Sequence, residues 1–271
     1  MEKKLNSFTK YLEVLKTAWE DNLVYRTNLL LWRLRLIMSL LILYFLWSTV
    51  FLSTDKVFGY DRASILTYVL GTSFVRSLVL SSTSSDVAGE IHNGRLTNFL
   101  LKPFSYIGYW FTRDLADKIL GLVFSILEIS IIIWIFKPPI ILQRDPGIWL
   151  AFSVATILAL ILFFYLSFLI SLMAFWIREI WGLRFLTMTS LEFLSGGMFP
   201  LDILPSGFFN LLKFLPFTYL IFFPLKVYLG QVRGPEMFQG ISILLLWIGI
   251  LYFAVKLVWA KGLRVYAGEG R

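Results

Sequence analysis

Six apolar stretches, each long enough to cross a bilayer as an α-helix, occupy most of the chain. A hydrocarbon core about 30 Å thick requires roughly 20 such residues, because each backbone N–H and C=O group must be satisfied inside the segment. The polar and apolar alternation of a membrane β-barrel is not seen. We therefore expect an all-α polytopic membrane protein with spans over residues 36–53, 63–82, 119–136, 149–176, 183–198 and 239–260.

The composition agrees with lipid as the main solvent of this chain. Apolar residues make up 58% of the 271 residues and charged residues only 15%, against about 25% in a typical soluble domain. The net charge of +8 does not indicate nucleic acid, since Lys and Arg flank the spans instead of forming one basic face. The absence of cysteine excludes disulfides and cysteine-based metal sites.

The distribution of positive charge predicts the topology. An even number of spans places both termini on one side, and the segments on that side hold 16 Lys and Arg against seven on the other. By the positive-inside rule both termini are expected to be cytoplasmic. Before the first span, apolar residues recur in steps of three and four, which predicts an amphipathic helix on the inner membrane surface within residues 1–35. It would act as an anchor or packing helix or, alternatively, bind a partner; its apolar residues are Leu5, Phe8, Leu12, Leu15 and Trp19.

The inner segment between spans two and three, residues 83–118, is too long for a simple turn. Gly94 can end one short helix, and Leu96 starts a second apolar face that Pro103 interrupts. Such a short helix would fit a groove on a cytosolic partner. His92, the only histidine, lacks a second metal ligand nearby and is expected to be a solvated loop residue.

The segment after span five is strongly apolar, yet prolines break it at positions 200, 205, 216 and 224. A straight transmembrane helix is therefore excluded, and we expect short helices that dip into the outer leaflet and return. Asp202 is placed to cap the short helix that follows it. The alternative is an extracellular cap without a role in transport.

The predicted spans carry charged residues inside their apolar runs, notably Arg76, Glu128 and Glu192. A central charge costs about 2.5–3.5 kcal/mol on insertion scales, so these side chains should face protein or water. Arg76 and Glu128 fall at similar depth, and we hypothesise that they pair, either as an interhelical staple or as part of a gate. Glu192 lies nearer the outer end, where it would support the re-entrant helices.

Together these features resemble the permease subunits of type-2 ABC transporters. The resemblance covers nearly the whole chain and is carried by the six spans, by GEIHNGRLTNFLLKP (residues 89–103) and by FLSGGMFPLDILP (residues 193–205). It is nearest to permeases of uncharacterised cargo, which often pair two unlike permeases with a separate ATPase. The resemblance implies an amphipathic interface helix in residues 1–35, then a permease domain over 36–271 with a coupling segment (83–118) and a re-entrant segment (199–238).

The resemblance also implies roles for particular residues. Coupling to the ATPase would involve Glu90, Gly94, Leu96, Leu100, Lys102 and Pro103. The outer gate would involve Gly196, Gly197, Phe199, Pro200, Leu201, Asp202 and Pro205.

No G-x-x-x-x-G-K-[ST] loop occurs in the chain, so the usual phosphate-binding loop is missing. We expect no cofactor on this chain, ATP on a partner ABC ATPase, and a second permease, identical or not, to complete the pathway of an exporter in a prokaryotic cell membrane. An ATP-independent carrier or channel is the alternative, although no pair of inverted broken helices is evident. A lipid-modifying membrane enzyme is less favoured, because no acid pair, His–carboxylate pair or metal cluster stands out.

Overall fold

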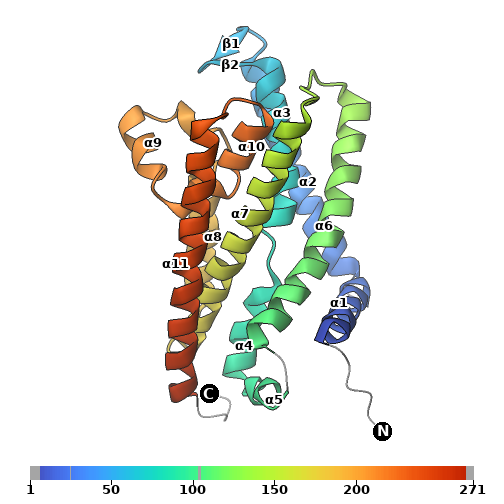
Figure 1. Cartoon of the computed structure of the whole chain (residues 1–271). Helices are drawn as coiled ribbons and strands as arrows, with labels where there is room; N and C mark the ends of the chain where they lie inside the picture. The colour runs from blue at the N-terminus through green and yellow to red at the C-terminus, as the bar shows by residue number, and fades with distance from the viewer. Residues whose placement is uncertain (1–6, 25, 103–104, 267–271) are drawn as a thin grey trace.

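The computed structural model describes residues 7–24, 26–102 and 105–266. It is an elongated bundle of long helices that run roughly along one axis (Figure 1). The long helices are α2 (Arg26–Val50), α3 (Arg62–Val79), α6 (Tyr106–Phe136), α7 (Pro146–Leu172) and α11 (Pro235–Val265), accompanied by the shorter α8 (Trp181–Leu194). The only strands among the described residues are β1 (Lys56–Val57) and β2 (Tyr60–Asp61), an antiparallel hairpin between α2 and α3.

The remaining helices gather at the two ends of the bundle. At one end lie α1 (Ser7–Val24), α4 (Asp86–His92), α5 (Leu96–Leu100) and the last turn of α11 (Figure 1). At the opposite end lie the hairpin, α9 (Ser206–Leu212) and α10 (Phe222–Tyr228). We call these the inner and the outer end, following the predicted topology. Four 3₁₀ turns join the described helices: η1 (Thr83–Ser85), η2 (Met173–Phe175), η3 (Leu201–Ile203) and η4 (Pro216–Tyr219).

Several helices can cross a membrane. Among the described residues, four helical segments are long and apolar enough: Leu30–Val50, Tyr106–Phe136, Pro146–Phe175 and Pro235–Val265. The number rises to six if each bent pair of helices counts as one span, and these pairs are Arg62–Val79 with Thr83–His92 (45°) and Ser206–Leu212 with Pro216–Tyr228 (78°). The helical, multi-pass architecture predicted from the sequence is thereby confirmed.

The exact set of six spans stays a prediction. Helix α8, at the place of span five, has only 14 residues. At 1.5 Å per residue it is about 21 Å long, shorter than a hydrocarbon core of about 30 Å. The helix at the place of span three is longer than expected, since α6 begins at Tyr106, well before the predicted start at 119.

Helix α7 is the centre of the bundle. Its residues Ala155, Ala159, Phe163 and Phe168 are fully buried, and α3, α10 and α11 all pack on it. Asp145 caps its first turn by accepting a hydrogen bond from the Gly147 amide (2.8 Å). This central helix fixes the places of the inner and outer short helices relative to each other.

Helix α1 lies along the inner half of α6. An ion pair between Asp21 and Arg113 (3.4 Å) joins the two helices, and Gly108 leaves room for the Tyr11 hydroxyl. The predicted apolar face is partly covered, with Leu12 still 48% exposed. Leu5 lies outside the described residues, and an interface role for this helix stays a prediction.

Candidate functional site: the inner and outer segments

Residues 83–102, called here the inner segment, are anchored from inside the bundle. Val87 and Leu96 are fully buried and Ile91 nearly so, in a cluster with aromatic residues of α6 and α7 that include Trp110 and Phe168. Spacing of apolar residues along α4 produces this inward face. The segment is therefore a fixed part of the fold at the inner end.

Two polar side chains add to this anchoring. Glu90 accepts a hydrogen bond from the Tyr106 hydroxyl at 2.6 Å, which ties α4 to the start of α6. His92 Nε2 lies 3.2 Å from the Ala174 carbonyl oxygen and 3.1 Å from that of Ile177, so an Nε2–H group donates to the turn after α7. The expectation that His92 is a solvated loop residue is wrong, because these carbonyls satisfy its ring.

The tip of the inner segment faces outward. Leu100, the last residue of α5, is 48% exposed, and Leu101 after it is 82% exposed. Helix α5 lies at the inner end of the molecule (Figure 1). Lys102 is exposed too, with its Nζ 4.5 Å above the centre of the Phe99 ring. We call Leu100, Leu101 and Lys102 the inner tip.

The residues to which the resemblance assigns coupling thus fall into two groups. Glu90 and Leu96 hold the segment in place from within, whereas Leu100 and Lys102 belong to the inner tip. Gly94, with φ of +71°, separates α4 from α5, and Pro103 lies outside the described residues. Of the coupling residues that the structure describes, only Leu100 and Lys102 are exposed.

Residues 195–228, called here the outer segment, begin at the glycine pair. Gly196 has φ of +82°, and a Cβ there would lie 2.6 Å from the Tyr68 hydroxyl and 2.8 Å from Phe222 Cβ. A Cβ on Gly197 would lie 2.7 Å from an Arg76 nitrogen. Glycine is required because the chain turns and α3 approaches closely. In return, Tyr68 of α3 donates a 2.6 Å hydrogen bond to the Gly196 carbonyl oxygen.

Arg76 pairs with Glu192, and not with Glu128. Arg76 Nη1 and Nη2 each lie 2.6 Å from a carboxylate oxygen of Glu192 in α8, and Nη2 also donates to the Gly197 carbonyl oxygen at 3.3 Å. Glu128 instead lies 3.7 Å from Arg33 of α2. The hypothesis of an Arg76–Glu128 pair is therefore wrong. The two residues lie at similar depth, but Arg76 extends from the face of α3 that points to α8, and Glu128 of α6 is not on that side. Support of the outer segment by Glu192 fits this geometry.

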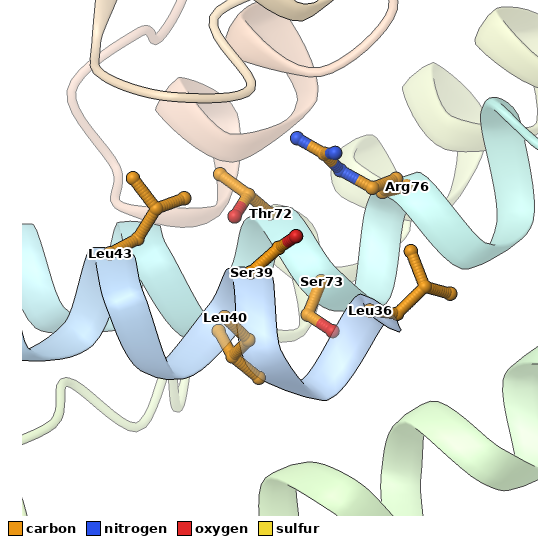
Figure 2. A pocket seen from close by; sticks show the side chains of 7 residues that line it. All are labelled: Leu36, Ser39, Leu40, Leu43, Thr72, Ser73 and Arg76. Carbon is orange, nitrogen blue, oxygen red and sulfur yellow. The ribbon is translucent and has the colours of Figure 1, made fainter. Parts of the chain in front are cut away.

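Arg76 also lines a small pocket between α2 and α3. Its volume of about 20 Å³ is enough for a water molecule. Figure 2 shows the guanidinium extending from α3 beside the hydroxyl groups of Ser39 and Thr72. The remaining lining residues are Leu36, Leu40, Leu43 and Ser73.

A second polar cluster lies at the outer end and consists of Tyr60, Asp202 and Lys226. The Tyr60 hydroxyl donates to the Asp202 carboxylate (2.8 and 3.0 Å), and Lys226 Nζ donates to Asp202 (2.6 Å) and to the Tyr60 oxygen (2.9 Å). Burial, reinforced by the Asp202 charge, raises the pKa of Tyr60, which keeps the phenol protonated as a donor. The three residues join the hairpin, η3 and α10.

This geometry corrects the expected role of Asp202. The side chain does not cap the next helix, because α9 begins after Pro205 with no side-chain hydrogen bond at that cap. Its carboxylate instead makes charge-assisted hydrogen bonds to Tyr60 and Lys226, which are distant in the sequence. Of the other residues assigned to the outer gate, Leu201 is fully buried, Pro200 is buried, Phe199 is partly buried and Pro205 is exposed.

Comparison with known proteins then decides the family. The family model described as ABC-2 family transporter protein matches residues 36–270, which takes in both segments and nearly all the described helices. The chain belongs to the ABC-2 transporter family. It is a multi-pass ABC transporter permease, as the sequence predicted. A search of curated proteins found no match to this ABC-2 permease.

Sequence reasoning missed three charged residues of the ABC-2 permease. Arg33, Asp114 and Lys118 were taken as parts of segments outside the spans, yet Asp114 and Lys118 are buried in α6 and Arg33 reaches Glu128. The signal that could have found them is the spacing of four between Asp114 and Lys118, directly before an apolar run. Among the described residues, no group of three or more His, Asp or Glu could hold a metal ion.

Proposed function

We propose that this permease is the membrane-spanning subunit of an ATP-driven exporter and that a separate ABC ATPase binds its inner tip. ATP hydrolysis would take place on the partner, and this chain would provide half of the translocation pathway. A second permease, identical or not, would supply the other half. The ATPase would act through the inner segment, and the outer segment would form the outer gate.

The observation that carries this proposal is the inner tip itself. Two leucines, of which one is 82% exposed, lie at the inner end on a segment whose other apolar residues are buried or, in the case of Phe99, partly buried. Rigid presentation of exposed apolar side chains next to a lysine suits a groove on another protein. The match to the ABC-2 family makes an ABC ATPase the natural owner of that groove.

The Arg76–Glu192 pair supports a pathway on the side of α2, α3 and α8. The side chains of this pair are 17% and 37% exposed, although they lie among apolar helices. Exposed charge at such a depth is expensive against lipid and is expected to face protein or water. We place the second permease and the cargo path on this side. The apolar character of these helices favours an amphipathic or lipid-linked cargo over a free ion.

The test is co-purification from the native host in mild detergent. Tagged wild-type protein is expected to recover a P-loop ATPase, and Leu101→Arg is expected to lose it, because a charge would enter the apolar groove. Leu142→Arg is the matched control, since Leu142 is 71% exposed in the outer loop between α6 and α7. Both variants carry the same change at an exposed leucine, at opposite ends of the molecule.

Two outcomes would contradict the proposal. Recovery of the permease alone, under several extraction conditions, would favour an ATP-independent carrier. Recovery of the ATPase with Leu101→Arg as efficiently as with wild type would move the docking surface away from the inner tip. Quantifying the co-purified chains also shows whether a second, unlike permease is present.

A further inference from the structure

The chain bends sharply where the inner segment leaves α3. Helix α3 ends at Val79, η1 begins at Thr83, and the helical axes on the two sides of this break differ by 45°. The last carbonyl groups of a helix lack intrahelical partners and carry partial negative charge, whereas the first amide groups carry partial positive charge. A cation at the end of the first helix and an anion at the start of the second therefore stabilise a break inside a bundle.

A buried ion pair of α6 supplies both charges. Lys118 Nζ donates to the carbonyl oxygens of Val79 (3.4 Å) and Ser81, at the end of α3. Asp114, one turn earlier and 3.3 Å from Lys118, accepts a hydrogen bond from the Thr83 amide (3.0 Å) at the start of η1. The two residues are only 1% and 0% exposed. Each charge thus faces the partial charge of opposite sign, and we call this arrangement the α6 clamp.

Weaker contacts hold the same break from other helices. The Ser84 hydroxyl donates to Ser167 of α7 at 2.8 Å, and Arg184 of α8 approaches the Ser82 carbonyl oxygen at 3.5 Å. Neither contact reaches both sides of the break. Among the described residues, the α6 clamp alone joins the end of α3 and the start of η1 to one rigid helix through charged groups.

We propose that Asp114 and Lys118 are positioning residues that make α6 the pivot between the inner segment and α3. Because a buried charge cannot leave its partners cheaply, the end of α3 and the start of η1 stay attached to α6, and the inner segment and α3 would turn about α6 as one unit. Helix α3 holds the outer segment through Tyr68 in its outer half and through Arg76 in its last turn. A pull on the inner tip then reaches the outer segment as a rotation of α3. This inference rests on the proposed function.

One substitution releases the clamp without leaving a charge unpaired. Thr83→Pro removes the amide hydrogen that Asp114 accepts, while Asp114 keeps Lys118. Ser82 is already extended (φ −157°, ψ 126°), as a residue before proline must be, and proline is tolerated at the first position of a helix. The matched control is Thr83→Ala, which removes the hydroxyl and keeps the amide hydrogen.

The absence of native cysteine allows single fluorescent labels to report movement at each end. Gly89→Cys labels α4 and Gly207→Cys labels α9; both positions are exposed, and an added Cβ meets no atom within 4 Å. The measurement uses the purified complex with its ATPase in lipid nanodiscs, and records ATP hydrolysis and the emission change at each label on adding ATP. No cargo is needed.

With Thr83→Pro we expect hydrolysis within about twofold of wild type, an unchanged signal at Gly89 and a signal at Gly207 reduced at least fivefold. Thr83→Ala should leave both signals intact. Equal signals at Gly207 in Thr83→Pro and wild type would overturn the proposal. A wild-type signal at Gly207 in the exchange variant Asp114→Lys with Lys118→Asp would overturn it too. The exchange keeps the ion pair, but it places each charge beside a helix end of the same sign.

Failure of the proposed function gives a different result. In that case the wild-type complex contains no ATPase, and the label at Gly89 does not respond to ATP; the inference then falls as well. A complex that hydrolyses ATP and responds at Gly89, but shows no dependence of the Gly207 signal on the clamp, contradicts this inference alone.

Discussion

The two ends of α3 are held in different ways. At the inner end, the buried pair of Asp114 and Lys118, with side chains 0% and 2% exposed, binds backbone groups on both sides of the break. At the outer end, the hairpin that leads into α3 is joined to η3 and α10 by side chains that water can reach, as in Lys226 with Asp202, whose side chains are 12% and 26% exposed. The backbone that leaves α3 is thus held by a dry ion pair, and the hairpin that enters α3 is held by a wetter one.

This difference separates what must stay in place from what can be released. A buried pair that loses one partner leaves an uncompensated charge in a dry environment, which is strongly destabilising. A partly exposed pair that separates regains hydration and loses little. The proposed outer gate would have to open, and the wetter contacts lie at that end. The dry contacts lie where the inner segment joins α3.

The largest effect on stability is expected at the α6 clamp. Lys118→Met should lower the free energy of unfolding by about 3–5 kcal/mol, because Asp114 remains buried without its cation. Adding Asp114→Asn to the same chain should recover part of the loss. Lys256→Met, at an exposed lysine of α11, is the control. Unfolding in mixed micelles measures the three variants, and equal stability of Lys118→Met and Lys256→Met would show that the inner end is not the fixed one.

The next effect is expected at the glycine pair. Gly196→Ala should destabilise by about 2–3 kcal/mol, since alanine is strained at φ of +82° and its Cβ would displace Tyr68 or Phe222. Gly207→Ala is the matched control, because a Cβ there has no neighbour within 4 Å and alanine favours the helix. Thermal unfolding of both variants checks this. If the two alanines behaved alike, the close approach of α3 to the outer segment would be in doubt.

A smaller effect tests the corrected pairing of Arg76. A double-mutant cycle of Arg76→Met with Glu192→Gln should give a coupling free energy of about 1 kcal/mol, the scale for contacting residues that are partly solvated. The cycle of Arg76→Met with Glu128→Gln should give none, as Glu128 lies beside Arg33. Reversal of these two couplings would restore the original hypothesis that Arg76 pairs with Glu128.

The elements that sequence reasoning predicted are those governed by local pattern. Apolar runs long enough to span a bilayer became helices, and prolines at 200, 205 and 216 lie at the starts of short helical turns as their missing amide requires. The start of α6 was missed because Asp114 and Lys118 read as solvated loop residues. The polar run at residues 81–86 marks the break after α3, but no local signal shows that Asp114 and Lys118 pack against it.

For the candidate site, the sequence predicted the motif residues but not their partners. The glycine pair and Asp202 were found as a motif, but the partners of Asp202 are 142 and 24 residues away, and no spacing rule reports such contacts. Likewise, arithmetic on helix depth placed Arg76 level with Glu128 without fixing which face of α3 carries the arginine. Rotation about the helix axis, set by packing on α7 and α8, decided that Glu192 is the partner.

The smallest loss of stability is expected at the partly exposed cluster of Tyr60, Asp202 and Lys226. Tyr60→Phe removes one donor to Asp202, while Lys226 remains bonded to it at 2.6 Å, so the loss should be about 0.5–1.5 kcal/mol. Lys226→Met should lose more, because it removes a charged donor, yet less than Lys118→Met, whose partner Asp114 is sealed from water. Thermal unfolding of the three variants ranks them. If Tyr60→Phe matched Lys118→Met, the outer end would be as firmly fixed as the inner one, and the cluster would be a structural staple instead of a contact that opens with the gate.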